Sequence, residues 1–497
     1  MTMASGINHL RSKVVQALCA VAWLCVACAC TLEPRYRAPE LPVPDRWPTT
    51  AATPERAERT AGRPATTPDR LGVNLAAHDI GWRDFFLDTR LQQLINLALA
   101  NNRDLRAAVL NIEQARAQYR IQRATLMPSL DAAGSFTREK LPASSTYGVP
   151  TPASDTFAGL LVTSYEVDLF GRMRSLTHAA LEQYVAQVEA RRGAQLSLIA
   201  EVANAYLTLA SDRELGHLAR ETLDSQEQSF TLARRQHETG TVSGLELAQS
   251  QTTVERARAD AARIEGDIAQ DIDALTLLVG TSIDPALLPT QFDPKTMGLD
   301  PLPAGVPSAV LLRRPDVLAA EHTLRAANAD IGAARAAFFP DIALTSNLGS
   351  ESNQLSNLFK SATGTWVFES LLSLPIFHGG ALMASLNVAH VNQKIALTQY
   401  QKAIQSGFRE VADALALTAT LSRQTAAQES VVEATGRAYK LSQRRYQVGR
   451  DSFLEVLDSQ RSDYAARQGL ITTLLAEQSN RVTLYKALGG GWREETP

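Results

Sequence analysis

The sequence predicts an internally duplicated membrane protein in which each half contributes one long β-hairpin and a set of long helices. A shift of about 210 residues aligns one half of the chain with the other. Proline is absent from long stretches rich in Ala, Gln and Arg, as expected for helices, whereas two segments rich in Gly, Ser, Thr and aromatic residues alternate as strands do. Because the repeat is too long for a solenoid of short units, similar halves are expected to line a common axis.

The duplication rests on several landmarks. Residues 104–128 align without a gap with residues 316–340. Farther along, Gly240 and Ser243 correspond to Gly449 and Ser452. One unit, used twice, therefore builds almost the whole chain after its N-terminal segment.

The first residues are typical of an exported lipoprotein. Arg11 and Lys13 precede an apolar run, so residues 1–29 are expected to be a signal peptide. Small residues before Cys30 and a proline-rich segment after it favour cleavage there and acylation of Cys30, with Cys28 as an alternative. An ordinary cysteine-rich signal peptide is a competing interpretation. All the cysteines lie at this end, so internal disulfides are not expected: Cys19, Cys25, Cys28, Cys30.

Residues 30–80 are predicted to form a lipidated start and an extended strap, because proline recurs through them. The first repeat is expected over 81–284. Its helical spacing begins at Trp82 and continues from about Thr89 to Met127, as one short helix. The remaining elements are a β-hairpin at about 129–170, a long helix at about 172–238, a glycine turn at 240 and a helix over about 243–279.

The second repeat is expected over 313–489, after a proline-rich linker at 285–312 and before a tail at 490–497. It repeats the same order, with a hairpin at about 341–377 and a glycine turn at 449. After each turn the pattern Ser-x-x-Glu, at Ser243 and again at Ser452, predicts a helix N-cap. At about 1.5 Å per residue, each long helix would extend on the order of 100 Å, which indicates a rod or a tube.

The strand count indicates assembly. Two hairpins give four strands per chain, and each is long enough for the roughly 9–11 residues of a tilted transmembrane strand. Unpaired edges are not tolerated in hydrocarbon, so several chains must close one barrel. Counting alone allows a dimer with eight strands or a trimer with twelve.

Composition excludes several functions. The formal net charge of −3 leaves no basic surface for nucleic acid. The histidines are scattered, with no His or Cys spacing typical of a metal site and no nucleophile elbow or phosphate loop. We therefore expect no enzyme activity, no cofactor and no metal.

Motifs spread over the chain resemble the outer-membrane efflux factors of the TolC family, in particular the NodT-type lipoproteins. The resemblance covers about Cys30 to Gly489. It is carried by the following motifs: the run from Trp82 through Phe85 and Asp88 to Leu105, the start at Cys30-Thr31-Leu32-Glu33-Pro34, Glu166-x-Asp168-Leu169-Phe170-Gly171, Arg313-Arg314-Pro315-Asp316 and Phe339-Pro340.

This resemblance implies a TolC-like homotrimer with a twelve-stranded outer-membrane β-barrel and a long α-helical barrel in the periplasm. It implies passive export of small molecules such as drugs and toxic compounds after docking of a periplasmic adaptor and an inner-membrane pump, commonly of the resistance-nodulation-division type. The chain would be anchored by lipid in the bacterial outer membrane.

The resemblance also implies roles for residues near the glycine turns. The constricting positions at the periplasmic tip fall on Leu454, Glu455 and Asp458, although capping explains Glu455 as well. Three copies of Asp458 would form an acidic ring that favours cations. The tips that meet the adaptor correspond to the following residues: Arg235, Gly240, Ser243, Arg444, Gly449, Ser452.

Two other functions fit the same pattern. One is a lipid-tethered periplasmic scaffold or adaptor without a pore, and the other is the channel of a protein secretion system. The exported substrate, the partner pump and adaptor and the open diameter are not encoded in any motif of the chain.

Overall fold

The computed structural model describes residues 31–44, 47, 80–140, 142, 153–292, 308–491 and 494–495. The expected signal peptide, Cys28, Cys30 and most of the strap beyond residue 44 lie outside the described residues. Two compact units make up the chain, and each takes residues from both repeats. The first comprises Met1–Glu40, Asn111–Val188 and Ala319–Tyr400, and the second comprises Leu41–Leu110, Glu189–Leu318 and Gln401–Pro497.

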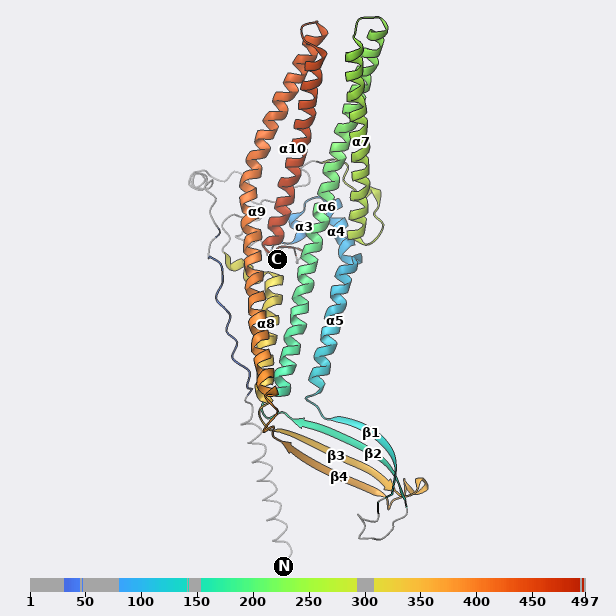
Figure 1. Ribbon diagram of the computed structural model, residues 1–497, viewed down its shortest axis with the longest axis vertical. Coiled ribbons are helices and arrows are strands. Elements are labelled where there is room, and N and C mark those ends of the chain that lie inside the picture. Colours follow the sequence, from blue (N-terminus) through green and yellow to red (C-terminus); the bar gives the residue numbers. More distant parts are fainter. Residues whose placement is uncertain are drawn as a thin grey trace, which may run out of the picture. The chain divides into compact units, whose positions relative to one another are not determined.

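The first unit contains a four-stranded antiparallel sheet (Figure 1). Its strands are β1 (Ser129–Glu139), β2 (Ser154–Val167), β3 (Asp341–Ser352) and β4 (Gly364–Ser373). They follow sequence order, so the hairpin of the first repeat pairs with that of the second through β2 and β3. Four strands per chain were predicted, and four are present in the described residues. Within them, β1 and β4 each have one edge without a partner strand.

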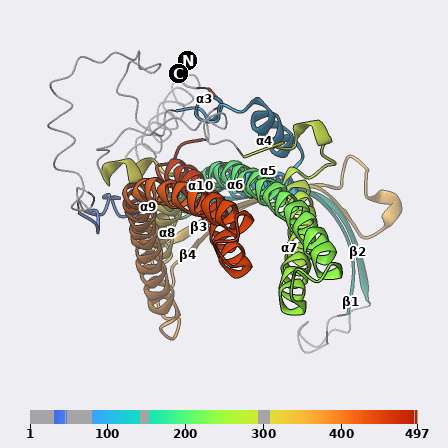
Figure 2. The same ribbon diagram turned by 90° about the horizontal axis from the view of Figure 1, so that it is seen from above.

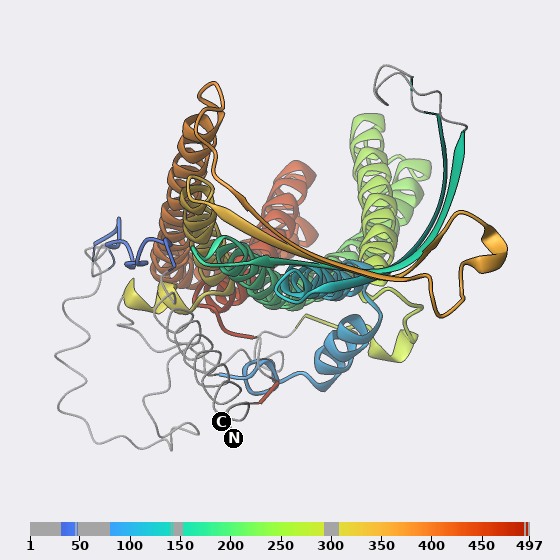
Figure 3. The ribbon, with the colours of Figure 1, turned by 90° about the horizontal axis from the view of Figure 1, so that it is seen from below.

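The two faces of this curved sheet differ in polarity (Figure 3). The register places the following residues on one face, where most are exposed: Leu130, Phe136, Phe157, Leu161, Leu348, Trp366, Phe368, Leu372. The other face carries a more polar set: Asp131, Ser135, Ser164, Thr345, Asn347, Glu369. Apolar and polar faces alternating along each strand are typical of a sheet with lipid on one side and water on the other.

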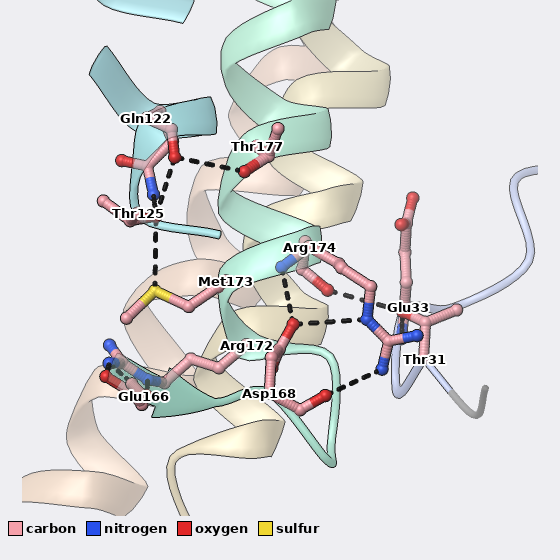
Figure 4. A network of polar contacts seen from close by, with 11 residues as sticks. Thr31, Glu33, Gln122, Thr125, Glu166, Asp168, Arg172, Met173, Arg174 and Thr177 are labelled. Carbon is pink, nitrogen blue, oxygen red and sulfur yellow. Dashed lines mark hydrogen bonds and ion pairs between the residues drawn. The ribbon is translucent and has the colours of Figure 1, made fainter. Parts of the chain in front are cut away.

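Charged pairs hold the junction between β2 and helix α6 (Arg172–Glu238). The Arg172 guanidinium lies 2.7 Å from the Glu166 carboxylate, and the backbone N–H of Arg174 donates to Asp168 Oδ2 at 2.9 Å (Figure 4). Gly171 between them has a φ of 78°, a left-handed conformation that favours glycine. The motif from Glu166 to Gly171 therefore fixes the direction in which the helix leaves the sheet.

The second unit is built on a core of aromatic and aliphatic side chains around helices α3 (Trp82–Phe85) and α4 (Thr89–Asn101). The ring of Tyr485 stacks on Phe85 with centroids 3.9 Å apart, and its hydroxyl donates to the Ile80 carbonyl at 2.7 Å. Burial of the Tyr485 phenol raises its pKa, so it stays protonated. The last helix, α10 (Phe453–Ala487), is thereby bound to the first helical residues.

The expected single helix over about 89–127 is wrong in one respect, because it is broken at Asn102. Helix α4 ends at Asn101, and α5 (Arg103–Ala124) begins anew. Asn102 has extended backbone, its Oδ1 accepts from the Leu105 N–H at 2.9 Å, and its amide donates to the Leu278 carbonyl at 2.9 Å. An asparagine that caps the new helix and bonds to a distant chain segment is more stable here than in a helix interior.

The long helices fold back on shorter ones in both repeats (Figures 1 and 2). Helix α7 (Gly244–Val279) contacts α6 through Thr253, whose hydroxyl donates to Gln226 at 2.9 Å. In the second repeat α8 (Pro315–Ala336) precedes β3, and α9 (Ala381–Gln447) contacts α10 through Asn480, which donates to the Ala414 carbonyl at 2.9 Å. No helix in the described part of the chain is long and apolar enough to cross a membrane.

Substitution of Gly349→Ala should force β2 and β3 apart. An added Cβ would overlap the carbonyl oxygen of Gly159 and lie 2.8 Å from Leu160 Cα. Overpacking of this kind costs roughly 1–3 kcal/mol, so the unfolding temperature in detergent should fall. Gly134→Ala is the matched control, because its Cβ would meet the Ala158 carbonyl at an ordinary 3.9 Å. Equal unfolding temperatures for the two variants would show that Gly349 does not limit the approach of the strands.

Candidate functional site

Each long helix ends in a glycine turn. Gly240 and Gly449 have φ values of 76° and 73°. The N–H of Thr241 donates to the Gln236 carbonyl at 2.9 Å, and that of Arg450 donates to the Arg445 carbonyl at 2.8 Å. This six-to-one pattern is the Schellman motif, which satisfies the last carbonyls of a helix and requires a left-handed residue. Both turns are therefore fixed by backbone chemistry at the predicted glycines.

The helix that follows each turn begins with a serine N-cap. Ser243 Oγ accepts from the Glu246 N–H at 3.2 Å, and Ser452 Oγ accepts from the Glu455 N–H at 3.4 Å. These are the caps that the Ser-x-x-Glu pattern predicts. Because the two carboxylates are not needed for the serine bond, they are available for other partners near the helix N-terminus.

Charged side chains surround the second turn more densely than the first. Arg445 binds Asp451 at 2.7 Å across the Gly449 turn, and the hydrogen bond from Arg445 lowers the Asp451 pKa. Arg235 and Arg444, expected to stand near the turns, are both exposed. The pair Arg445–Asp451 was not predicted, because the first repeat has Gln236 and Val242 at the corresponding positions.

One hydrogen bond joins the two helical hairpins near their turns. The Tyr446 hydroxyl, at the end of α9, donates to Glu246 Oε1, at the start of α7, at 2.9 Å. Burial, followed by the bond to Glu246, raises the pKa of Tyr446 to about 12. Its ring also packs beside Phe453, with centroids 5.5 Å apart. We call this contact the tyrosine tie.

A second tyrosine contact lies farther from the turns. The hydroxyl of Tyr464 on α10 donates to Asp260 on α7, and Gln468 donates to the same carboxylate at 3.3 Å. Burial opposes ionisation of Asp260, but hydrogen bonds from Tyr464 and Arg263 lower its pKa overall. A cavity of about 260 Å³ adjoins this contact, lined in part by Thr222, Gln226 and Arg461. The two hairpins are therefore connected at two levels.

The candidate gate residues lie on the first turns of α10. The Leu454 side chain is 53% exposed. Asp458 is 74% exposed, and its Oδ1 lies 3.1 Å from the Arg461 guanidinium on the next turn. Any ring formed by copies of Asp458 would therefore carry a ring of Arg461 beside it. Among the described residues, no group of three His, Cys, Asp or Glu side chains could hold a metal ion.

Comparison with known proteins gives one family over most of the chain. The model of the family described as outer membrane efflux protein matches residues 94–281 and again residues 306–490, once in each repeat. The chain is 47% identical over 468 residues to the antibiotic efflux pump outer membrane protein ArpC of Pseudomonas putida, covering 94% of both chains. It is 46% identical to the toluene efflux pump outer membrane protein TtgC of a solvent-named system in the same species, with the same coverage.

Solved structures agree with this comparison. The open state of the outer membrane channel MtrE of Neisseria gonorrhoeae superimposes with a TM-score of 0.80 at 37% identity. The match covers 94% of this chain and 100% of MtrE. The described fold is thus similar to that of an outer membrane channel along nearly its whole length.

Substitution of Tyr446→Phe should loosen the connection between the hairpins. A hydrogen bond of this kind contributes roughly 1 kcal/mol, so the population of separated hairpins should rise about fivefold. Spin labels on cysteines introduced at Thr241 and Arg450, which are exposed, would report the distance between the turns by pulsed electron resonance. Tyr439→Phe, two turns earlier on α9, is the control. An unchanged distance distribution for Tyr446→Phe would show that the tie does not restrain the hairpins.

The same labels test the pH dependence of the tie. Because the pKa of Tyr446 is raised to about 12 from an ordinary value near 10, its stabilising contribution is complete below pH 10. It should be lost as the pH rises through about 12. Distance distributions that stay constant below about pH 10 and broaden above it are expected only with Tyr446 intact.

Proposed function

Because the chain belongs to the outer membrane efflux protein family, we propose that it is the exit duct for antibiotics and aromatic solvents of a pump of the resistance-nodulation-division type. One observation carries the choice of substrate: 94% of the chain aligns at 46–47% identity with relatives named for antibiotic and toluene efflux. Small apolar or amphiphilic compounds are the chemistry that these names share.

The assembly is a trimeric outer membrane channel that works with an adaptor and an inner-membrane pump. Four strands cannot close a barrel, but three chains supply twelve. The free edge of β1 in one subunit then pairs with the free edge of β4 in the next, which satisfies the backbone groups that hydrocarbon cannot. Neither of the other two functions, a scaffold without a pore or a protein secretion channel, is needed to explain these relatives.

We propose that the periplasmic gate is formed by Leu454, Glu455 and Asp458, which lie on the first turns of α10. An exposed leucine so close to a turn suits an apolar constriction, and Asp458 adds negative charge beside it. The tyrosine tie supports the same assignment, because it restrains the hairpin that carries these residues. Opening would require Tyr446 to leave Glu246.

We propose that the adaptor docks on the two glycine turns. Their backbone is fixed by the Schellman bonds, so they present constant shapes to a partner. The residues of this surface are exposed around each turn: Arg235, Gly240, Ser243, Arg444, Gly449, Ser452.

We propose that cleavage after residue 29 leaves Cys30 as an acylated first residue, followed by the strap to residue 80. The two repeats at 81–284 and 313–489, the linker at 285–312 and the tail at 490–497 complete the proposed organisation. The described residues directly after Cys30 support this arrangement, since Thr31 contacts Ser175 at the start of α6 at 3.4 Å. Mass spectrometry of the mature N-terminus, with Cys30→Ala as the control, distinguishes Cys30 from Cys28.

The proposed function is tested in the source bacterium by deleting the gene and measuring growth in antibiotics and toluene. Susceptibility to both classes should rise several-fold and return to normal with the intact gene. Complementation must fail when the partner pump is also deleted. If susceptibility is unchanged while a secreted protein disappears from the medium, the chain serves secretion instead.

Substitution of Asp458→Asn should reduce the cation preference of the open channel. Each trimer loses three negative charges at the gate, so the ratio of cation to anion permeability should fall roughly twofold. The reversal potential in a salt gradient across a planar bilayer measures it. Asp413→Asn is the matched control, because Asp413 on α9 is similarly exposed and also has an arginine partner, Arg409 at 3.9 Å. Equal shifts for both variants would remove Asp458 from the gate.

A further inference from the structure

The start of the strap lies in a groove of the first unit between α6 and α8. Asn328 Nδ2 donates to the Pro34 carbonyl at 2.7 Å, and Arg335 Nη1 donates to the Leu32 carbonyl at 3.4 Å. Farther along, the Tyr36 hydroxyl donates to Glu321 at 3.2 Å. Side chains from α8 therefore bind both the backbone and a side chain of residues 31–36, which we call the strap start.

The groove is shaped for close approach of this backbone. A Cβ added to Gly332 would lie 2.8 Å from Glu33 Cα and 2.7 Å from Ser175 Oγ. Such a distance is shorter than carbon atoms adopt without contact strain, so only glycine admits the strap start at this depth. The fit is specific to the position of Glu33.

Glu33 reaches a histidine whose two ring nitrogens both face carboxylates. His178 Nδ1 lies 3.1 Å from both oxygens of Glu33, and Nε2 lies 3.4 Å from Glu182 Oε1. The side chains of Glu33 and Glu182 are only 16% and 13% exposed. Figure 4 shows Glu33 and Thr31 of the strap beside the first turns of α6.

A neutral imidazole has one N–H and one lone pair, so in this position it must turn a lone pair toward one carboxylate. Only the imidazolium donates to both at once, and hydrogen bonds between charged groups are the stronger kind. Imidazole ordinarily gains its charge between about pH 8 and pH 5. The geometry therefore binds the strap start more tightly when His178 is protonated.

The other charged groups of the groove belong to the same elements. On α8, His322 Nδ1 lies 2.6 Å from Glu182 Oε2, and Arg325 binds Glu321 at 2.6 Å. The following groups are also present around the groove: Asp168 with Arg174 at the start of α6, Asp330 and Arg335 on α8, and Tyr36 on the strap, which lies under Arg325. Of these, only His322 also titrates near neutral pH by its ordinary chemistry, and it contacts Glu182 rather than the strap.

We propose that His178 is a pH-sensitive clasp that fixes the start of the N-terminal strap to α6 and α8 in acid and releases it as the pH rises. This clasp needs Glu33, Glu182 and the proton on His178. It does not depend on the acylation of Cys30 or on the exported substrate.

The full-length trimer in detergent, with a spin label on a cysteine introduced at the exposed Arg37, tests the clasp. The chain has no cysteine after Cys30, so the parent without the new cysteine gives the background. From about pH 5 to about pH 8, the ratio of immobilised to mobile label should fall. The expected change is about tenfold, roughly what one charge-assisted hydrogen bond contributes.

Three variants make the result decisive. His178→Gln, which cannot change its charge, should abolish the pH dependence. His217→Gln should preserve it, since His217 is an exposed α6 histidine with a single carboxylate partner, Glu221 at 3.6 Å. Gly332→Val should leave the label mobile at every pH, because the groove is filled. A pH response that persists in His178→Gln, a parent without a response, or an immobile label in Gly332→Val would each overturn the proposal.

Discussion

The constraint on which the structure depends is the requirement that every backbone N–H and C=O in hydrocarbon has a partner. One chain supplies four strands and leaves one edge of β1 and one edge of β4 open, so no single chain satisfies this requirement. Three chains do, and the trimer follows from backbone hydrogen bonding before any side chain is considered. The apolar face with Trp366 and Phe368 then meets lipid, and the face with Asn347 and Glu369 lines water.

Duplication gives the two repeats the same backbone but not the same contacts. Both turns use a left-handed glycine and a serine cap, yet Tyr446 replaces His237 of the first repeat. The His237 ring stays within its own turn, 2.9 Å from the Val242 carbonyl, whereas the Tyr446 hydroxyl reaches the other hairpin. Divergence at one position thus converts a local turn contact into a connection between hairpins. Motion of the second hairpin relative to the first is where such asymmetry matters.

Local chemistry made much of this fold predictable. Glycine and serine at the turns, proline-free helices and alternating strands depend on neighbouring residues, and the sequence indicates them directly. The break at Asn102 was missed because its cause is a bond to Leu278, 176 residues away. The same reason hid Tyr446, whose partner Glu246 is 200 residues distant, and His178, which is 145 residues from Glu33. Gate and docking residues came from family resemblance, since no local rule separates a gate carboxylate from a helix cap.

The stack of Tyr485 on Phe85 has a consequence for biogenesis. These residues and the bond to Ile80 join positions 405 apart, so the core of the second unit is incomplete until the last helix has been synthesised and exported. Contacts of such high sequence separation form late and leave apolar surface uncovered meanwhile. The emerging chain must therefore cross the periplasm in the care of chaperones, and truncation of only its final helix would leave a species that proteases remove.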